Sequence, residues 1–537
     1  SKNYQKINLK KPRIMKKIIF LCSLLICSMS NAWCQIDSLN GHIPIGFGPS
    51  FTTPFNPDDF VSQPLPEPET TGDFRRLYFI HGLGGDPSSW TVASDACWDE
   101  ELHIPGFLAR NCFVTRLDYT HSVNGTLNTA AYQIRDDIRL QAQQDILNYG
   151  LDPARAIIFG HSQGGVVGRT ILHLDATGDD PYPWYGLGYG GFVNVTGPLQ
   201  GAKILNNRHK IQDMAEDACR SLIKGPESSN FWIDKILQVL DKDYTITNGV
   251  CNVVSQQLLP TFFSDYYQSI TADYCVDAPF IDELNRDSIY PIYNNLQKIS
   301  AYAVEDQNNL FWRTANWLIH NPNDAAPFEA NDDWDFYNTF IHPAYQYYKS
   351  NYLVNEARYE NSMNVANCTW WIPLVGLGAY LHAQMFYNRM LNWQEGVEWF
   401  DNADDCWKNV IGAKEVHINR IAHGVSRILW PEYGFTQDAV TSIYNYLNGM
   451  PVVHNSWQIV FEDKLNDGIV LAESAADLTS ATHTPIKIYG SCDAGAGSQG
   501  SSHMQVRNDY GFKEFLNNLF NGNYGTFFQT SPKQQGN

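Results

Sequence analysis

A Gly-x-Ser-x-Gly turn at the end of an apolar run most strongly limits how this chain can fold. Residues 156–159 read Ala-Ile-Ile-Phe, the motif fills residues 160–164, and a helix-compatible segment follows at 166–173. A sharp strand-to-helix turn projects a serine hydroxyl clear of the backbone, and its glycines relieve the crowding of the turn. We therefore predict that Ser162 is the nucleophile of an acyl-transfer enzyme. The amide N–H of Gln163 is then aimed at the developing oxyanion.

Short apolar runs with strand character alternate with helical segments around this motif. The runs lie at 77–80, 113–117, 156–159, 191–195, 299–304 and 486–489, and helix candidates include 128–148 and 511–520. This alternation is typical of a parallel sheet covered by helices, so we expect an α/β protein. Its 537 residues are too many for one simple core, so we also expect a large insertion or a second domain.

A glycine-rich turn follows the first of these runs. Residues 81–85 read His-Gly-Leu-Gly-Gly. Glycines at the end of a strand allow a backbone N–H to face a reacting carbonyl group. We therefore predict that the amide of Leu83 is a second oxyanion donor beside that of Gln163.

Four segments together carry a family pattern. They are Tyr-Phe-Ile-His-Gly-Leu-Gly-Gly at 78–85, Gly-His-Ser-Gln-Gly-Gly-Val-Val-Gly-Arg at 160–169, Thr-Gly-Pro-Leu-Gln-Gly-Ala at 196–202 and Leu-Asn-Asp-Gly-Ile-Val at 465–470. This set resembles α/β-hydrolase lipases, most of all bacterial secreted triacylglycerol lipases and the GPI-inositol deacylase-like group. In the third segment, Leu199 replaces the histidine of those lipases. The resemblance implies an α/β-hydrolase fold, a mostly parallel sheet with helices on both faces.

The resemblance also implies the partners of the nucleophile. In such lipases an Asn-Asp-Gly turn carries the triad acid, and the histidine lies between the last strand and the last helix. These places map onto Asp467 and His503. The resulting chain order, Ser162, Asp467, His503, is the order expected of this fold.

Three other residues compete for roles in the site. Asp306 follows the run at 299–304 and remains an alternative acid. His483 is an alternative base, but it precedes the last strand-like run and so lies at the wrong end of it. His161 is beside the nucleophile and points elsewhere at a sharp turn, so we expect a structural or pocket residue.

Two-step acyl transfer by a serine triad requires neither a metal ion nor an organic cofactor, and we expect none. In the lipases that this chain resembles, an aspartate two residues after the histidine binds structural calcium. Gln505 stands at that position here, so the calcium site is not carried over.

The resemblance covers residues 74–202 and 455–525, which we expect to form the hydrolase core. Residues 203–454 are predicted to be a helical cap or lid insertion, with the strand at 298–305 belonging either to it or to the core. The most apolar stretch, 370–386, predicts a buried or interfacial helix in preference to a membrane span. The aromatic residues of the insertion suit an apolar acyl pocket or an ordinary core.

The N-terminus predicts export. A basic segment at 15–17 precedes an apolar run at 18–29 that is too short to span a bilayer. We expect residues 1–34 to comprise upstream sequence and a signal peptide cleaved after Ala32 or Cys34. A Pro/Gly-rich extended arm is expected at 35–73, and a tail at 526–537.

Eight of the eleven cysteines follow Cys34. In an exported protein this number predicts up to four disulfides, for which Cys97–Cys112 and Cys368–Cys406 are candidate pairs. No zinc-type spacing of cysteine and histidine is found in the sequence, so we interpret the cysteines as structural.

The formal net charge of −20 argues against a nucleic-acid partner. The expected substrate is a small-molecule or lipid ester, with transient contact to a lipid interface. An amidase, a polyester depolymerase or an acyltransferase uses the same triad, and a non-catalytic binding protein on a hydrolase scaffold is a further alternative. The oligomeric state, the acyl chain length and the head group stay open.

Overall fold

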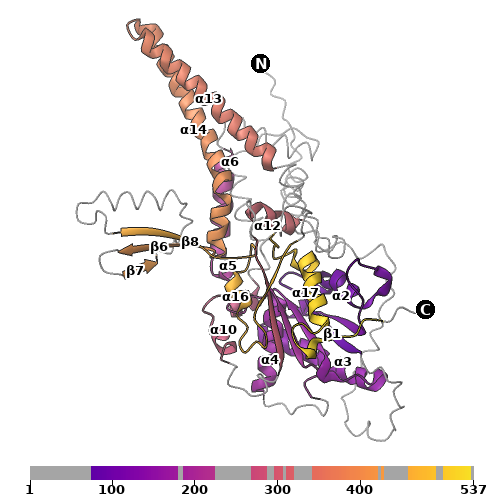
Figure 1. Ribbon diagram of the computed structural model, residues 1–537. Coiled ribbons are helices and arrows are strands. Elements are labelled where there is room, and N and C mark those ends of the chain that lie inside the picture. Colours follow the sequence, from indigo (N-terminus) through magenta and orange to yellow (C-terminus); the bar gives the residue numbers. More distant parts are fainter. Residues whose placement is uncertain are drawn as a thin grey trace, which may run out of the picture.

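A six-stranded parallel sheet is the centre of this protein (Figure 1). The structure is a computed structural model that describes residues 74–178, 186–223, 268–286, 296–305, 310–319, 341–420, 425–428, 457–490 and 500–533. The strands of the sheet are β1 (Arg75–Ile80), β2 (Cys112–Leu117), β3 (Ile157–His161), β4 (Gly191–Val195), β5 (Gln297–Ala303) and β9 (Ile486–Ile488). All six runs predicted from the sequence thus form strands of one sheet, and the α/β class is confirmed.

The order of the strands reverses direction between β1 and β3. Their order is β2-β1-β3-β4-β5-β9, and every neighbouring pair is parallel. From β1 the chain proceeds to one side of the sheet, and from β3 it proceeds to the other. In an open parallel sheet, ligands bind beyond the carboxyl ends of the strands at such a reversal. The turns after β1 and β3 are the two glycine-rich motifs of the sequence.

Each face of the sheet buries its own apolar core. Leu77 and Phe79 of β1 join a cluster under α2 (Thr91–Trp98) and α17 (Tyr510–Phe520). Tyr78 and Ile80 join the opposite cluster with α3 (Leu127–Tyr149) and α4 (Gln163–Thr177). Side chains alternate between the faces of a strand, so a strand buried on both faces reads as a continuous apolar run.

Polar contacts attach α3 to this sheet. In α3, the Thr126 side chain caps the N-terminus, and Gly150 ends the helix in the left-handed conformation. Arg76 of β1 forms a buried pair with Asp145 of α3, in which Nε donates to Oδ2 at 2.8 Å. This pair fixes α3 against the edge of the sheet that carries β1 and β2.

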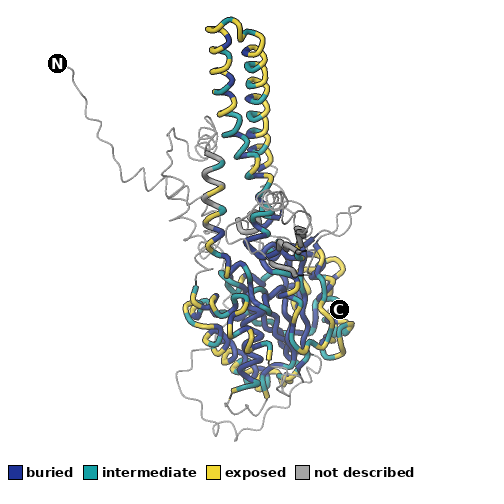
Figure 2. Tube along the Cα trace, turned by 90° about the vertical axis from the view of Figure 1, so that its left-hand side faces the viewer, coloured by how far each residue is buried: buried dark blue, intermediate teal, exposed yellow. Residues whose placement is uncertain are grey.

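Between β4 and β9 the chain leaves the core and forms a long helical hairpin. The described helices of this region are α5 (Lys203–Asn206), α6 (Arg208–Ile223), α10 (Pro279–Leu284), α12 (Leu310–Ile319), α13 (His342–Thr369), α14 (Pro373–Val410) and α16 (Ala472–Ala476). Helices α13 and α14 pack antiparallel and project away from the sheet (Figures 1 and 2). Trp407 and Val410, near the end of α14, belong to the same apolar cluster as α3 and α4. The base of the hairpin is therefore part of the core.

The predicted insertion is not entirely helical. Strand β5 belongs to the core sheet, and a separate antiparallel sheet has the order β7-β6-β8. Its strands are β6 (Lys414–Arg420), β7 (Val425–Ile428) and β8 (Trp457–Asp463). The second core segment, predicted to begin at 455, therefore opens with a strand of this smaller sheet.

The apolar stretch at 370–386, predicted to be a buried or interfacial helix, is neither one unbroken helix nor buried, and an interfacial position stays a prediction. Residues 370–372 form the turn between α13 and α14, because Pro373 starts a new helix. Trp370 and Trp371 are exposed at this turn. Within the part of the chain that the structure describes, no helix is both long enough and apolar enough to cross a membrane.

Neither candidate disulfide is formed. The five cysteines whose side chains are described, Cys97, Cys112, Cys275, Cys368 and Cys406, are free thiols. Cys112 contacts the backbone of Cys97, its Sγ 3.4 Å from the carbonyl oxygen, and burial raises the Cys112 pKa to about 12. Cys368 lies at the end of α13, beside the start of α14, and Cys406 lies near the end of α14, so the two are separated by about 50 Å of helix at 1.5 Å per residue. The predicted signal peptide, the predicted arm at 35–73 and the side chains of Cys219, Cys251 and Cys492 lie outside what the structure describes.

Candidate active site

Ser162 occupies a sharp turn between β3 and α4. Its backbone has φ 55° and ψ −127°, a conformation that a side-chain-bearing residue rarely adopts. The turn is possible because its glycines allow close approach of the backbone. A β carbon at Gly160 would lie 2.3 Å from the Gly164 carbonyl oxygen, and one at Gly164 would lie 2.3 Å from the His81 carbonyl oxygen. The sequence motif therefore folds as predicted, with the serine hydroxyl at the carboxyl edge of the sheet.

The structure brings Ser162, His503 and Asp467 together in one line. Nε2 of His503 lies 2.8 Å from Oγ of Ser162, and Nδ1 of His503 lies 2.7 Å from Oδ2 of Asp467. His503 and Asp467 are buried, at 2% and 1% exposure. The backbone also joins the pair, because the amide of His503 donates to the carbonyl oxygen of Asp467 at 2.8 Å.

These contacts determine where the protons of His503 lie. An ionised carboxylate only accepts hydrogen bonds, so Nδ1 of the neutral ring carries its proton and donates it to Asp467. Nε2 is then the acceptor that faces the hydroxyl of Ser162. The other carboxylate oxygen, Oδ1 of Asp467, accepts from the amides of Ile469 at 3.1 Å and Val470 at 2.7 Å. Both oxygens of the acid therefore have fixed and different partners.

Contacts from three parts of the chain hold the turn that carries Asp467. The side chain of Asn466 accepts from the amide of Gly468 at 2.9 Å, and its carbonyl accepts from the amide of Glu305, directly after β5, at 2.7 Å. Gly468 has φ 94°, where a β carbon would lie 2.5 Å from Oγ1 of Thr314. The indole of Trp407 donates to the Gly468 carbonyl at 2.7 Å. Helices α12 and α14 thus position the acid.

The turn after β1 lies directly against the serine. A β carbon at Gly82 would be 2.8 Å from Cβ of Ser162. The amide of Gly85 donates to the Gly82 carbonyl at 3.0 Å and closes the turn that contains Leu83. Gln163 is the first residue of α4, where the amide N–H has no carbonyl partner within the helix. Both predicted oxyanion donors therefore belong to segments that meet at Ser162.

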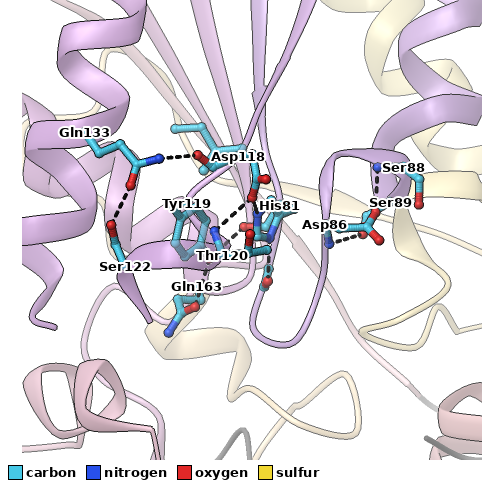
Figure 3. A network of polar contacts seen from close by, with 12 residues as sticks. His81, Asp86, Ser88, Ser89, Asp118, Tyr119, Thr120, Ser122, Gln133 and Gln163 are labelled. Carbon is cyan, nitrogen blue, oxygen red and sulfur yellow. Dashed lines mark hydrogen bonds and ion pairs between the residues drawn. The ribbon is translucent and has the colours of Figure 1, made fainter. Parts of the chain in front are cut away.

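The side chain of Gln163 is held between two tyrosines. Its Oε1 lies 2.8 Å from the hydroxyl of Tyr119, and its Nε2 donates to the hydroxyl of Tyr274 at 3.0 Å. The Tyr119 hydroxyl also lies 3.0 Å from the carbonyl oxygen of His81 (Figure 3). Sequence reasoning missed both tyrosines. Tyr119 lies two residues after β2, at the carboxyl edge of the sheet, and this position could have indicated a place near the site. Nothing in the sequence around Tyr274 indicated one.

His81, at the start of the glycine-rich turn after β1, is held by Tyr119 and Asp118. The ring of His81 stacks on Tyr119, with centroids 4.3 Å apart, and its Nε2 lies 3.4 Å from Oδ1 of Asp118. Figure 3 shows His81 beside these two residues. The hydrogen bond with His81 and a backbone bond from Thr120 lower the pKa of Asp118 well below its usual range. Asp118 is therefore a carboxylate at neutral pH and anchors the start of the glycine-rich turn.

His161 contacts the backbone of His503 and not the serine. Its Nε2 donates to the carbonyl oxygen of His503 at 2.9 Å. Burial, and then the nearby Arg507 and His503, lower the pKa of His161 well below its usual value. The ring is therefore neutral with its proton on Nε2. It is a structural residue of the site, although the sequence did not indicate this particular contact.

The position of the family calcium ligand is filled by a hydrogen-bonded amide. Gln505 is buried, its Nε2 donates to Oδ1 of Asp509 at 3.3 Å, and its Oε1 lies 3.5 Å from Nη2 of Arg313. A cationic partner on the amide oxygen does not suit a calcium ligand. Among the residues with described positions, no cluster of three His, Cys, Asp or Glu side chains is arranged to hold a metal ion.

The structure describes the alternative base, His483, but not the alternative acid, Asp306. Asp306 lies outside the described residues. His483 contacts its own loop and the ring of Tyr524, with centroids 5.1 Å apart. The neighbouring Thr482 bonds to Lys298, at the amino end of β5. His483 is therefore at the opposite end of the sheet from Ser162.

Comparison with known proteins gives one family match. Residues 77–216 match the alpha/beta hydrolase family. No curated protein matches the chain. Among solved structures, phospholipase PlaB from Legionella pneumophila is similar at 11% identity and a TM-score of 0.25, over 43% of this chain and 39% of the phospholipase. The lipase BlEst2 from Bacillus licheniformis is similar at 12% identity and a TM-score of 0.25, over 49% of this chain and 80% of the lipase.

The chain thus spans about two fifths of the length of the Legionella phospholipase. The matched segment contains β1 to β4, both glycine-rich turns and Ser162, and β5 and β9 extend the same parallel sheet. The family match and this sheet together identify the chain as a member of the α/β-hydrolase superfamily.

Proposed function

We propose that this protein is a serine hydrolase that cleaves carboxylic esters, with lipid acyl esters as its substrates. The strongest support is the hydrogen-bonded line from Asp467 through His503 to Ser162, at 2.7 and 2.8 Å. A nucleophile, a base within hydrogen-bond reach of it and a third group that orients the base are the requirements for a covalent acyl intermediate. Fold alone does not establish catalysis, so the proposal depends on these three side chains.

In the proposed reaction, the Oγ–H proton of Ser162 passes to Nε2 of His503 while Oγ bonds to the carbonyl carbon of the ester. The resulting oxyanion accepts hydrogen bonds from the amides of Leu83 and Gln163, each contributing about 3 kcal/mol to the barrier reduction. The carbon–oxygen bond to the alcohol then breaks, and His503 protonates the leaving oxygen. Asp467 stabilises the imidazolium without taking up its proton.

Water completes the cycle. It enters after the alcohol leaves, gives a proton to His503 and attacks the acyl carbon, after which His503 returns the proton to Ser162. His161 holds the main chain of His503 through its carbonyl oxygen. Because that bond does not involve the ring of His503, the imidazole keeps both nitrogens for Ser162 and Asp467.

The resemblance of the sequence to lipases favours an apolar substrate. Aromatic side chains of α12 and α14 gather behind the acid turn, with the rings of Phe311 and Trp407 5.7 Å apart and those of Phe311 and Trp399 6.3 Å apart. Trp407 is buried in the core, so these rings pack behind the turn. The proposal of a lipid ester over a small soluble one therefore depends on the resemblance.

The test is hydrolysis of p-nitrophenyl esters from C2 to C16 by the wild type, Ser162→Ala and the exposed control Ser88→Ala. We expect kcat/KM to increase with chain length, to vanish in Ser162→Ala and to be unchanged in Ser88→Ala. A maximum at C2 to C4 would keep the triad and reject a lipase. Turnover of p-nitroanilides but not esters would favour an amidase, and failure of a fluorophosphonate to label Ser162 would favour a binding protein.

We also propose that residues 1–34 direct export. The basic segment and short apolar run there support this. N-terminal sequencing of the protein recovered from a secreting host should give a mature chain that begins at Trp33 or Gln35. A chain that retains the apolar run inside the cell would reject the proposal.

A further inference from the structure

The far end of the helical hairpin has no charged side chains. Between Glu360 in α13 and Arg389 in α14 the sequence contains no Asp, Glu, Lys or Arg. We call residues 361–388 the hairpin tip; they comprise the end of α13, the turn and the first half of α14. The exposed face of a helix normally carries charged and polar residues. The rest of this chain has 94 residues of these four charged types, so their absence from the tip is a local feature.

The hairpin tip exposes large apolar side chains to solvent. Trp370, Trp371 and Leu374 are 77%, 67% and 86% exposed, and Leu377 and Leu381 are exposed as well. Figure 2 shows that the end of the hairpin stands clear of the other described parts of the chain. Large contiguous apolar surface is rare on soluble proteins and marks a binding surface.

At the tip, one face of α14 packs against α13 and the other face is exposed to solvent. Gly376, Ala383 and Phe386 are buried, and a β carbon at Gly376 would lie 2.9 Å from the carbonyl oxygen of Thr369. These residues therefore form the contact with α13. Leu374, Leu377 and Leu381 follow one another at helical spacing on the exposed face. The apolar stripe is thus additional to what the hairpin needs for its own packing.

The hairpin tip is too distant to line the candidate active site. Trp407 bonds to Gly468 beside the acid, and Pro373 begins α14 at the other end. At 1.5 Å per residue these positions are about 50 Å apart along a straight helix. The exposed apolar residues therefore do not contact an ester bound at Ser162.

Charged side chains of both signs, Arg358, Glu360 and Arg389, lie where the charge-free segment ends. The guanidinium of Arg358 lies over the ring of Phe386, 5.5 Å from its centroid, and Arg389 follows on the same helix. Arginine binds phosphate groups, and tryptophan favours the boundary between lipid and water. The charge-free part of α14 is about 24 Å long, less than the roughly 30 Å of a bilayer's hydrocarbon core.

We propose that the hairpin tip inserts into one leaflet of a phospholipid surface. Trp370, Trp371 and Leu374 enter the apolar layer, and Arg358 and Arg389 reach the phosphates. A lipid surface also accounts for the order of the side chains, with tryptophans and leucines at the turn and charged residues only where the segment ends, at Arg358, Glu360 and Arg389. The inference goes beyond the proposed function, because lipid binding by the hairpin tip requires no catalysis.

The test is flotation of the full chain with vesicles of diether phosphatidylcholine, which contain no carboxylic ester. All chains carry Ser162→Ala, so binding is measured without hydrolysis. The tip variant is Trp371→Ser, Leu374→Ser and Leu377→Ser. The matched control removes one tryptophan and two leucines from the surface of the core, with Trp98→Ser, Leu108→Ser and Leu140→Ser. In the wild type these three are 42%, 56% and 56% exposed.

We expect the tip variant to lose at least about tenfold in vesicle partitioning, because full burial of one large apolar side chain alone is worth about that factor. The control should stay within twofold of its parent. Equal flotation of the tip variant and its parent, or no flotation of the parent, would overturn the proposal. So would a dimer of the parent, seen by light scattering, that the tip variant abolishes.

Two further measurements separate this proposal from the proposed function. Thermal unfolding of both triple variants should match the parent within a few degrees, which shows that the hairpin folds. With Ser162 present, the tip variant should hydrolyse a soluble C4 ester at the parental kcat/KM. If the protein has no esterase activity, the flotation result stands unaffected.

Discussion

Replacement of Asp467 by asparagine tests the proposed role of the acid in a way that the structure makes specific. Oδ1 of Asp467 accepts two backbone amides, those of Ile469 and Val470, while Oδ2 faces Nδ1 of His503. An asparagine must place its carbonyl oxygen against the two amides, because its NH2 group would otherwise face two donors. Its NH2 group then points at Nδ1 of His503.

This orientation puts the histidine in the wrong tautomer. A donor at residue 467 requires Nδ1 of His503 to accept, so the proton of the neutral ring moves to Nε2. Nε2 then donates toward Ser162 and no longer takes up its proton. A tautomer change of this kind lowers kcat by about 10⁴ in serine-triad enzymes. That factor corresponds to about 5 kcal/mol of activation free energy.

Steady-state kinetics on a soluble p-nitrophenyl ester measures the effect. We expect Asp467→Asn to lower kcat by about 10⁴ with KM within threefold of the wild type and an unchanged melting temperature. Asp306→Asn is the control and should retain full activity. Activity within tenfold of the wild type in Asp467→Asn, together with its loss in Asp306→Asn, would refute the reasoning and make Asp306 the acid.

Three further predictions concern stability. Burial holds the pKa of His161 well below its usual value, so only the unfolded chain takes up this proton near pH 6.5. Stability should be complete above about pH 6.5 and fall below it by up to about 1.4 kcal/mol per pH unit. Urea unfolding from pH 5 to 8 should show a shallower slope for His161→Phe, and an equal slope would contradict this origin. In Gly164→Ala the new β carbon would lie 2.3 Å from a backbone oxygen, whereas in Gly378→Ala it would meet nothing within 4 Å. Calorimetry should show severe destabilisation in the first and a gain of about 0.5–1 kcal/mol in the second, and a stable Gly164→Ala chain would count against the close approach. Arg76→Met leaves Asp145 without its buried guanidinium partner and should cost about 3–5 kcal/mol in urea unfolding, so a loss under 1 kcal/mol would show that the pair is solvated.

The central sheet was predictable because its strands are buried on both faces. Leu77 to Ile80 and Ile157 to Phe159 are wholly buried, and such strands appear in a sequence as unbroken apolar runs. The small sheet of β6 to β8 was missed. Val416 and Ile418 alternate there with polar residues, a pattern that indicates a strand but is short and adjoins a long helix.

The candidate site was predictable where its geometry is local. Ser162 and the turn with Leu83 follow directly from glycine positions along the chain. The contacts of Tyr274 with Gln163, and of His161 with the carbonyl of His503, are decided by packing between elements distant in sequence. Likewise, the sequence left open whether the apolar segment at the tip of the hairpin is buried or interfacial, because periodicity does not reveal whether an apolar face has a partner.

The hairpin and small sheet lie inside one long connection, and polymer statistics explain why the core tolerates it. Strand β5 ends at Ala303 and its neighbour β9 begins at Ile486. The entropy of closing a flexible connection increases only with the logarithm of its length. Extending a crossover of about 20 residues to about 180 therefore costs only about 2 kcal/mol. A superfamily member can thus acquire a long projecting arm at this point at little cost to the stability of its core.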